Sequence, residues 1–173
     1  MNLIAITPEV YRAPGPVTAL GRAELDLLRE VVASSARGRV RINLHPDNND
    51  PLHEMFIAIR ADSYIRPHRH AGKSESFHLV EGEADVVVFD ETGNITHVVT
   101  LGGEDGARYY RLSAPLFHTL VIHSPLLIVH ETTNGPFAPD ATEFAAFAPA
   151  DSADPATIAS WQTSLMQRVR TRP

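Results

Sequence analysis

The chain has 173 residues, of which 43% are hydrophobic, so it suits one domain with a full apolar core. It contains no cysteine, which excludes disulfides, thiolate nucleophiles, zinc fingers and iron–sulfur clusters and leaves His, Asp and Glu as metal ligands. The formal net charge of −6 argues against a nucleic-acid-binding surface, which would need a basic stripe.

The N-terminal segment, residues 1–17, is predicted to be an irregular arm because it contains Pro8, Pro14 and Pro16 around Gly15. It shows no basic segment followed by a long apolar run, so we expect no signal peptide. The apolar stretches elsewhere are too short to span a bilayer. These features predict a cytoplasmic protein with no membrane partner.

A helix is predicted over residues 19–36. Thr18 is placed to cap its N-terminus, and Gly38 is placed to end it. Apolar side chains recur along it near helical spacing, namely Leu20, Leu25, Leu28, Val31 and Val32. We expect this helix and the preceding arm, residues 1–38, to pack on the rest of the domain.

From residue 39 to residue 132 the sequence changes to short runs rich in Val, Ile, Phe and Tyr, separated by turn residues. Strands are predicted over residues 39–44, 55–60, 64–67, 76–80, 84–90, 95–101, 109–112, 117–122 and 126–132. So many short strands in one stretch fit an all-β jelly-roll barrel, in which two sheets bury one core. We assign this barrel to residues 39–137.

The C-terminal extension, residues 138–173, is rich in Ala, Pro and Asp and is predicted to end in a helix over residues 155–169. One face of this helix carries an apolar stripe formed by Ile158, Trp161, Leu165 and Val169. The stripe is expected to cover one end of the barrel. The alternative is that it forms the contact of a homodimer.

The strongest chemical signal is His68-Arg69-His70 followed by Glu75. Residues two apart in a strand point to the same face, so His68 and His70 present two imidazoles together. A tight turn would return the carboxylate of Glu75 to that face. Two imidazoles and a carboxylate can bind one divalent transition metal, namely Fe, Mn, Ni, Co or Zn, with coordination positions left open.

This segment resembles the first motif of the cupin superfamily, since His68, His70, Glu75 and Gly82 match its spacing throughout. The second cupin motif supplies one more histidine from a later strand, and His118 resembles it more loosely. The resemblance implies a cupin-type jelly-roll (double-stranded β-helix) barrel. It also implies that His68, His70, Glu75 and His118 hold the metal.

Further segments between about residues 18 and 150 are similar to the WbuC family of cupin-fold metalloproteins. They include Arg41-x-Asn43-x-His45-Pro46, Lys73-Ser74-Glu75-Ser76-Phe77-His78 and Glu131-x-x-Asn134-Gly135-Pro136-Phe137. That family is associated with polysaccharide gene clusters. The resemblance therefore implies a link to surface-polysaccharide biosynthesis but names no substrate.

Two residues before the metal motif are candidates for catalysis or ligand binding. Tyr64 and Arg66 precede His68 by four and two residues, so strand alternation would place all three on the inner face of the barrel. An arginine inside an apolar barrel needs a partner, either an acidic side chain or an anionic ligand. We therefore expect Tyr64 and Arg66 to line the pocket beside the metal.

His45 is the third candidate. Arg41, Asn43 and His45 would share one face of a strand predicted to lie at the sheet edge. The pairs His53-Glu54 and His130-Glu131 do not continue into zincin motifs, because the second histidine is absent from both. The alternation of residues places His78 and His123 away from the metal, and His97 is expected on an outer strand.

These features leave three functional hypotheses. The first is a metal-dependent enzyme that isomerises, epimerises or cleaves a small polar substrate such as a sugar or an anionic sugar derivative. The second is an oxygenase that uses ferrous iron in the same ligand set. The third is a non-catalytic module that binds a small molecule through the metal. The fold alone does not choose among them, because one barrel hosts many chemistries.

Overall fold

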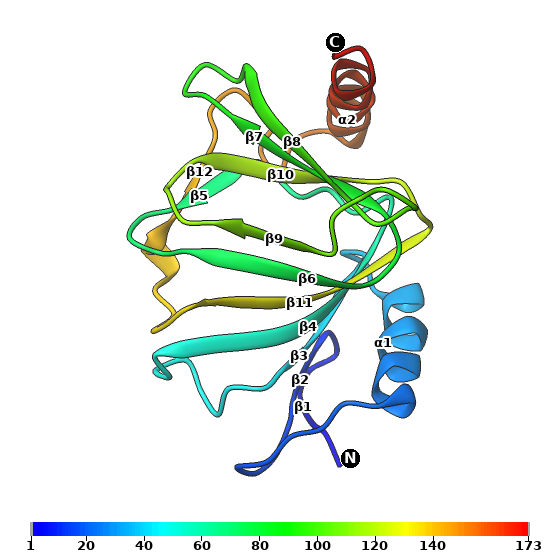
Figure 1. Ribbon diagram of the computed structural model, residues 1–173, viewed down its shortest axis with the longest axis vertical. Coiled ribbons are helices and arrows are strands. Elements are labelled where there is room, and N and C mark those ends of the chain that lie inside the picture. Colours follow the sequence, from blue (N-terminus) through cyan, green and yellow to red (C-terminus); the bar gives the residue numbers. More distant parts are fainter. Residues whose placement is uncertain (1, 173) are drawn as a thin grey trace.

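A computed structural model describes residues 2–172 as two β-sheets that face each other, with a helix at each end (Figure 1). The seven-stranded sheet has the order β1 (Ile4–Thr7), β2 (Val10–Arg12), β3 (Arg39–Asn43), β4 (Leu52–Arg60), β11 (Leu126–Asn134), β6 (Glu75–Glu81) and β9 (Tyr109–Leu112). The five-stranded sheet has the order β12 (Thr142–Phe144), β5 (His68–His70), β10 (Phe117–Ile122), β7 (Ala84–Phe89) and β8 (Ile95–Leu101). The predicted all-β jelly roll is confirmed.

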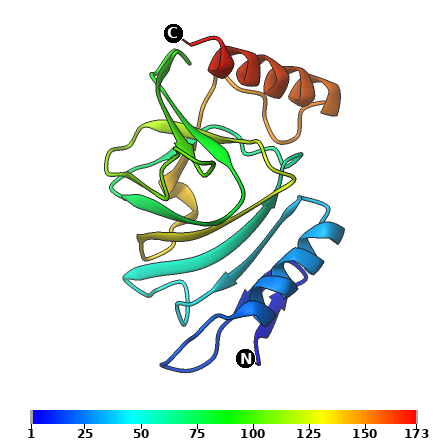
Figure 2. The same ribbon diagram turned by 45° about the vertical axis from the view of Figure 1, so that its right-hand side comes forward.

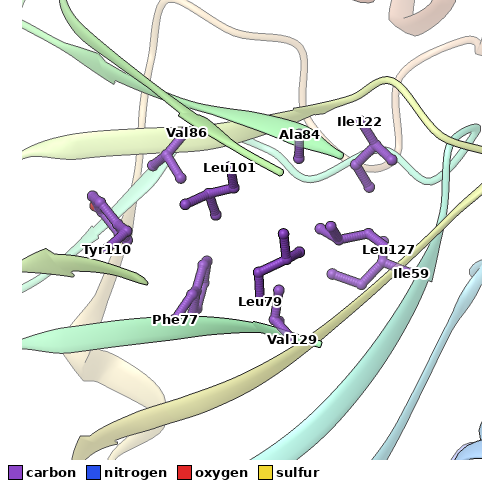
Figure 3. Packing of buried hydrophobic residues seen from close by; sticks show 10 residues of the cluster. All are labelled: Ile59, Phe77, Leu79, Ala84, Val86, Leu101, Tyr110, Ile122, Leu127 and Val129. Atoms are coloured by element: carbon purple, nitrogen blue, oxygen red, sulfur yellow. The ribbon is translucent and has the colours of Figure 1, made fainter. Parts of the chain in front are cut away.

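The main core lies between the two sheets, where buried side chains from both inner faces meet (Figure 3). Phe77, Leu79 and Val129 come from the seven-stranded sheet, and Ala84 and Val86 come from the five-stranded sheet. All six residues of β7 are buried, although neighbouring side chains of a strand point to opposite faces. The second face of β7 must therefore be covered as well.

Helix α2 (Pro155–Arg170) provides that cover. Its Leu165 packs in a cluster with Val87, Phe89, Phe117 and Val121, and Trp161 and Val169 lie against the same cluster. Pro155 occupies its first turn, and the side chain of Asp154 caps it by accepting hydrogen bonds from the backbone N–H groups of Ala156 and Thr157. The apolar stripe of this helix thus covers the barrel, which is the first of the two roles predicted for it.

Helix α1 (Arg22–Ser34) covers the outer face of the seven-stranded sheet (Figure 2). Leu28 and Val32 pack on Val40 and Ile42 of β3 and on other residues of that face. Because strand residues alternate, Arg39, Arg41 and Asn43 of β3 point to the opposite face. The helix therefore determines which β3 residues can take part in a site inside the barrel.

The N-terminal region differs from the prediction in two ways. The arm forms the strands β1 and β2, and β2 pairs in parallel with β3, so β3 is an interior strand and not the predicted edge strand. Helix α1 begins at Arg22, later than predicted, because Gly21 is its N-cap and donates its backbone N–H to Glu24 Oε2 at 2.8 Å. Thr18 is therefore not the cap.

Residues 64–67 do not form the predicted strand, and the strand β5 begins only at His68. The short strand β12 was not predicted, and it pairs with β5 along the edge of the five-stranded sheet. A 3-10 helix (Pro139–Ala141) leads into it. Within residues 2–172, no helix is both long and apolar enough to cross a membrane.

Candidate metal centre

Three imidazoles converge at one end of the barrel. His68 and His70 lie on β5, and β10 pairs with β5 so that His118 is opposite His68. One ring nitrogen of each histidine lies within 4.8 Å of those of the other two. His68 and His70 lie together because residues two apart in a strand share a face. His118 joins them because β10 pairs with β5.

Glu75 joins this cluster from the start of β6. Its Oε1 lies 2.9 Å from His118 Nε2, and its Oε2 lies 3.7 Å from His70 Nε2. Its side chain is only 6% exposed. The tight turn after His70 therefore returns the carboxylate to the imidazoles, as the sequence predicted.

The outer nitrogen of each imidazole is held by a separate partner. His68 Nδ1 donates to the backbone carbonyl of Arg66 at 2.8 Å, and His118 Nδ1 donates to that of Leu116 at 2.9 Å. His70 Nδ1 lies 3.1 Å from Thr142 Oγ1, which can accept from it. When Nδ1 donates, the neutral ring carries its lone pair on Nε2, and this is the arrangement found in metal-binding histidines.

The chemistry of these donors fits a divalent transition metal. The Nε2 lone pair of neutral His118 would face the carboxylate of Glu75 across a buried gap, and Glu75 Oε1 has no hydrogen-bond partner. Such an arrangement requires a cation or a proton between the two atoms. Three imidazoles and one carboxylate are ligands that Fe, Mn, Ni, Co and Zn accept. His68, His70, Glu75 and His118 would hold the ion.

The protonation of the cluster follows from its burial and its one carboxylate. Burial, reinforced by the nearby His118, lowers the pKa of His68 to about 4, which keeps this imidazole neutral. Burial also lowers the pKa of His70. Burial lowers the pKa of His118, but the interaction with Glu75 raises it by more, so the pKa of His118 lies above its ordinary value. Burial opposes ionisation of Glu75, but His118 outweighs it and lowers the pKa of the carboxyl.

A cavity of about 210 Å³ borders the cluster through His70. We call it the metal-side cavity. Its polar lining comes from β3, β4, β11 and β12, from the loop between β3 and β4 and from the turn between β5 and β6. It includes Arg41, His45, Asn48, His53, Lys73, Glu131, Thr133 and Thr142. A polar cavity beside the candidate metal centre suits a small polar ligand.

Sheet register explains why this lining is polar near the metal. Glu75 pairs with Thr133 on β11, and Thr133 pairs with His53 on β4, so the three share one row of the inner face. His53 therefore lies two strands, or about 10 Å, from Glu75 of the candidate metal centre. Two rows further along the strands, Ile57, Val129 and Leu79 form an apolar row. The site occupies the end of the barrel where polar rows replace apolar ones.

His45 and His53 form a stacked pair in this cavity, with ring centroids 4.1 Å apart and planes inclined by 5°. Both are buried, with exposures of 7% and 4%. His45 Nδ1 donates to the backbone carbonyl of Glu54 at 3.1 Å, and burial lowers the pKa of His45. His45, the third candidate from the sequence, thus lies in the metal-side cavity. Sequence reasoning missed His53 because the strand was predicted to begin at residue 55, whereas β4 begins at Leu52.

Glu131 also lines the metal-side cavity. Burial, reinforced by the charge of Glu75, raises the pKa of Glu131 to about 8. Both effects favour the protonated carboxyl, which can donate a hydrogen bond to a ligand. No local sequence pattern marks Glu131 for this role, because the position depends on the pairing of β11 with β4 and β6.

Tyr64 and Arg66 do not lie where the sequence predicted. The Tyr64 hydroxyl donates to the carbonyl of Pro149 at 2.8 Å, beside Trp161 of α2. Arg66 donates to the carbonyl of Ala145 at 3.0 Å, and neither side chain lines the metal-side cavity. The predicted common face with His68 is wrong, because residues 64–67 are irregular and strand alternation does not apply to them.

The remaining histidines lie outside the cluster. His78 and His97 are exposed, and His123 Nε2 lies 2.7 Å from Asp85 Oδ2. His130 stacks on Phe56 on the outer face of the seven-stranded sheet. Among residues 2–172, the only group of three or more candidate metal ligands within 4.8 Å of one another is His68, His70 and His118.

Comparison with known proteins relates the chain to cupin-fold structures. A model of a domain of unknown function (DUF6016) matches residues 20–101, and no curated protein matches in sequence. Protein SO0799 from Shewanella oneidensis is 12% identical with a TM-score of 0.59, over 86% of this chain and 97% of that one. An oxalate oxidase in complex with the substrate analogue glycolate is 11% identical with a TM-score of 0.51, over 78% and 75%. These likenesses show the fold, which is the cupin-type jelly roll that the sequence predicted.

Proposed function

We propose that this protein binds one divalent transition metal and uses it to act on a small polar substrate, a sugar or sugar derivative, in the metal-side cavity. The observation that supports this most strongly is the convergence of three imidazoles and the buried Glu75 carboxylate beside that cavity. A bound metal supplies Lewis-acid polarisation of a substrate oxygen.

The residues of the cavity would bind the substrate and move protons. His45 is fixed by Glu54 with Nδ1 as the donor, which leaves Nε2 as a proton acceptor. Glu131 offers a proton donor in the same cavity. An acceptor and a donor beside one substrate are what isomerisation, epimerisation and lyase reactions require, because each transfers a proton to or from carbon. The similarity to the WbuC family supports a role in surface-polysaccharide biosynthesis.

Metal analysis followed by a proton-exchange assay tests this function. The protein from its native source is expected to contain about one transition-metal ion per chain by mass spectrometry. In D₂O, NMR spectra of a panel of sugars and sugar acids should show deuterium entering one substrate, and His70→Ala should abolish that exchange. Metal-free native protein would contradict the proposal. Oxygen uptake without exchange would instead assign the site to an oxygenase.

A further inference from the structure

A second cavity, next to the metal-side cavity, is lined by three arginines. It also measures about 210 Å³, and its lining consists of Glu9, Val10, Arg37, Arg39, Val40, Arg41 and Ile57. We call it the arginine cavity. Arg41 lines both cavities, so the two adjoin at this side chain.

The arginines reach this cavity because of the pattern of β3. Val40 and Ile42 are buried beneath α1, so Arg39 and Arg41 must point to the other face of the sheet. Arg37 lies in the turn before the strand and lines the same cavity. Arg39 and Arg41 are thus held on this side of the sheet by the packing of Val40 and Ile42 on the other side.

The protein neutralises the positive charge of the arginine cavity only in part, since Glu9 attracts Arg37 and Arg39 and Glu131 attracts Arg41. Within the described part of the chain, none of Arg37, Arg39 and Arg41 forms an ion pair, and Arg39 Nε is buried without a hydrogen-bond partner. Glu9 is the one acidic residue in the lining, and it already accepts a hydrogen bond from the Ser35 hydroxyl. Three arginines against one carboxylate leave a net positive lining in a chain whose formal net charge is −6.

We propose that Arg37, Arg39 and Arg41 form a binding site for an oxyanion, the carboxylate or phosphate group of a small molecule. A planar guanidinium binds either group through two parallel hydrogen bonds. An anion would also relieve the mutual repulsion of the arginines. Because Arg41 borders the metal-side cavity, the anion is one end of the molecule whose other end reaches the metal. This last step rests on the proposed function, whereas the anion site itself does not.

The test measures anion binding by the full chain after treatment with a chelator, so that the metal does not contribute. Inorganic phosphate and malonate are titrated separately by calorimetry, with sodium chloride keeping the ionic strength constant. At least one of the two anions should bind wild-type protein. The anion that binds more tightly shows whether the site prefers a phosphate or a carboxylate group. Arg41→Gln should weaken that binding about tenfold or more, the usual effect of removing a hydrogen bond to a charged group.

Two further variants make the result decisive. Arg111→Gln removes the same charge from an exposed position on β9, the opposite edge strand, and should bind like wild type. Arg37→Gln, at an exposed position before β3, replaces Arg41→Gln if that variant does not fold. The inference is overturned if wild type binds neither anion, or if Arg41→Gln and Arg111→Gln bind equally well. A protein that binds the anion but no metal would overturn the proposed function and leave the anion site standing.

Discussion

The candidate metal centre depends on residues that contact the Nδ1 atoms of the three imidazoles and so fix the orientation of the rings. Carbonyl groups of Arg66 and Leu116 and the hydroxyl of Thr142 hold the outer nitrogens of the three histidines. This leaves the three Nε2 atoms and the Glu75 carboxylate directed at one another. The two backbone partners cannot be mutated away, so Thr142 is the side chain that tests this support.

Removal of a ligand should abolish metal binding and leave the fold intact. His70→Ala and Glu75→Gln each remove one donor from the cluster, and neither touches the core between the sheets. His78→Ala is the control, because His78 is exposed on the same strand as Glu75. Calorimetric titration with zinc or manganese should give tight binding for wild type and the control only. Tight binding by His70→Ala would show that the ligand set is wrong.

Thr142→Val should weaken the metal site without removing it. The substitution keeps the shape of the side chain but removes the oxygen 3.1 Å from His70 Nδ1. Loss of such an outer partner lowers metal affinity by about 10- to 100-fold. Thr142→Ser keeps the hydroxyl and should restore the affinity. Equal affinities for Thr142→Val and Thr142→Ser would mean that this contact does not orient His70.

At this scale, the sequence predicts what strand alternation and a tight turn control. His68, His70 and Glu75 were placed correctly because their spacing is local. Tyr64 and Arg66 were not, since the residues just before β5 are irregular and end on Pro67. The roles of His53, Glu131 and Arg41 depend on the register of three strands, which no short segment of the sequence contains.

Individual elements are held by turns and by helices that cover exposed faces. The turn between β6 and β7 depends on Gly82, which has φ of +91° and lies where a Cβ would come within 2.3 Å of the carbonyl oxygen of Leu126. Gly72 has a similar φ of +70°, but a Cβ there would have no atom within 4 Å. Substitution of Gly72 therefore adds backbone strain alone, whereas substitution of Gly82 adds both strain and a steric clash.

Gly82→Ala should destabilise the protein much more than Gly72→Ala. Both substitutions place alanine in the left-handed region, at a cost of about 1–2 kcal/mol. Only Gly82→Ala adds a clash with backbone, so its free energy of unfolding should fall by at least about 2 kcal/mol more. Urea denaturation monitored by circular dichroism measures both values. Similar losses for the two variants would show that the turn can shift to accept a side chain.

Helix α2 should contribute to stability through Leu165. This side chain is 3% exposed and packs on the outer face of the five-stranded sheet. Leu165→Ala should cost about 2–5 kcal/mol, as other buried leucines do. Ser164→Ala, at the exposed neighbouring position, should cost nothing. If Leu165→Ala is as stable as wild type in urea, the helix does not pack on the barrel in solution.

Elements with a strong period were predictable, and short paired segments were not. The inner strands and both helices follow from alternation or from helical spacing. Strands β1, β2 and β12 have three or four residues each and form because neighbouring strands offer them hydrogen bonds. Prolines around β1 and β2 favoured the prediction of an irregular segment in place of these strands. Two of these strands matter for the site, since β2 makes β3 an interior strand and Thr142 of β12 contacts His70.

In the molecule as a whole, the core is separate from the candidate metal centre. Two clusters of apolar residues on either side of the five-stranded sheet and a third under α1 hold the fold together. The protein should therefore stay folded without metal, unlike a zinc finger. Metal at 1,000 times its dissociation constant should stabilise the folded state by about 4 kcal/mol. An apo protein that is unfolded by circular dichroism would contradict this view.

We propose that His68, His70, Glu75 and His118 hold one metal ion. Crystals grown with zinc or manganese, with diffraction data collected at the absorption edge of that metal, test it directly. We expect one strong anomalous peak inside the barrel. When the metal is zinc, the peak should lie about 2.0–2.2 Å from the Nε2 atoms of the three histidines and from a carboxylate oxygen of Glu75. Strong metal peaks elsewhere, with none between these four side chains, would contradict it.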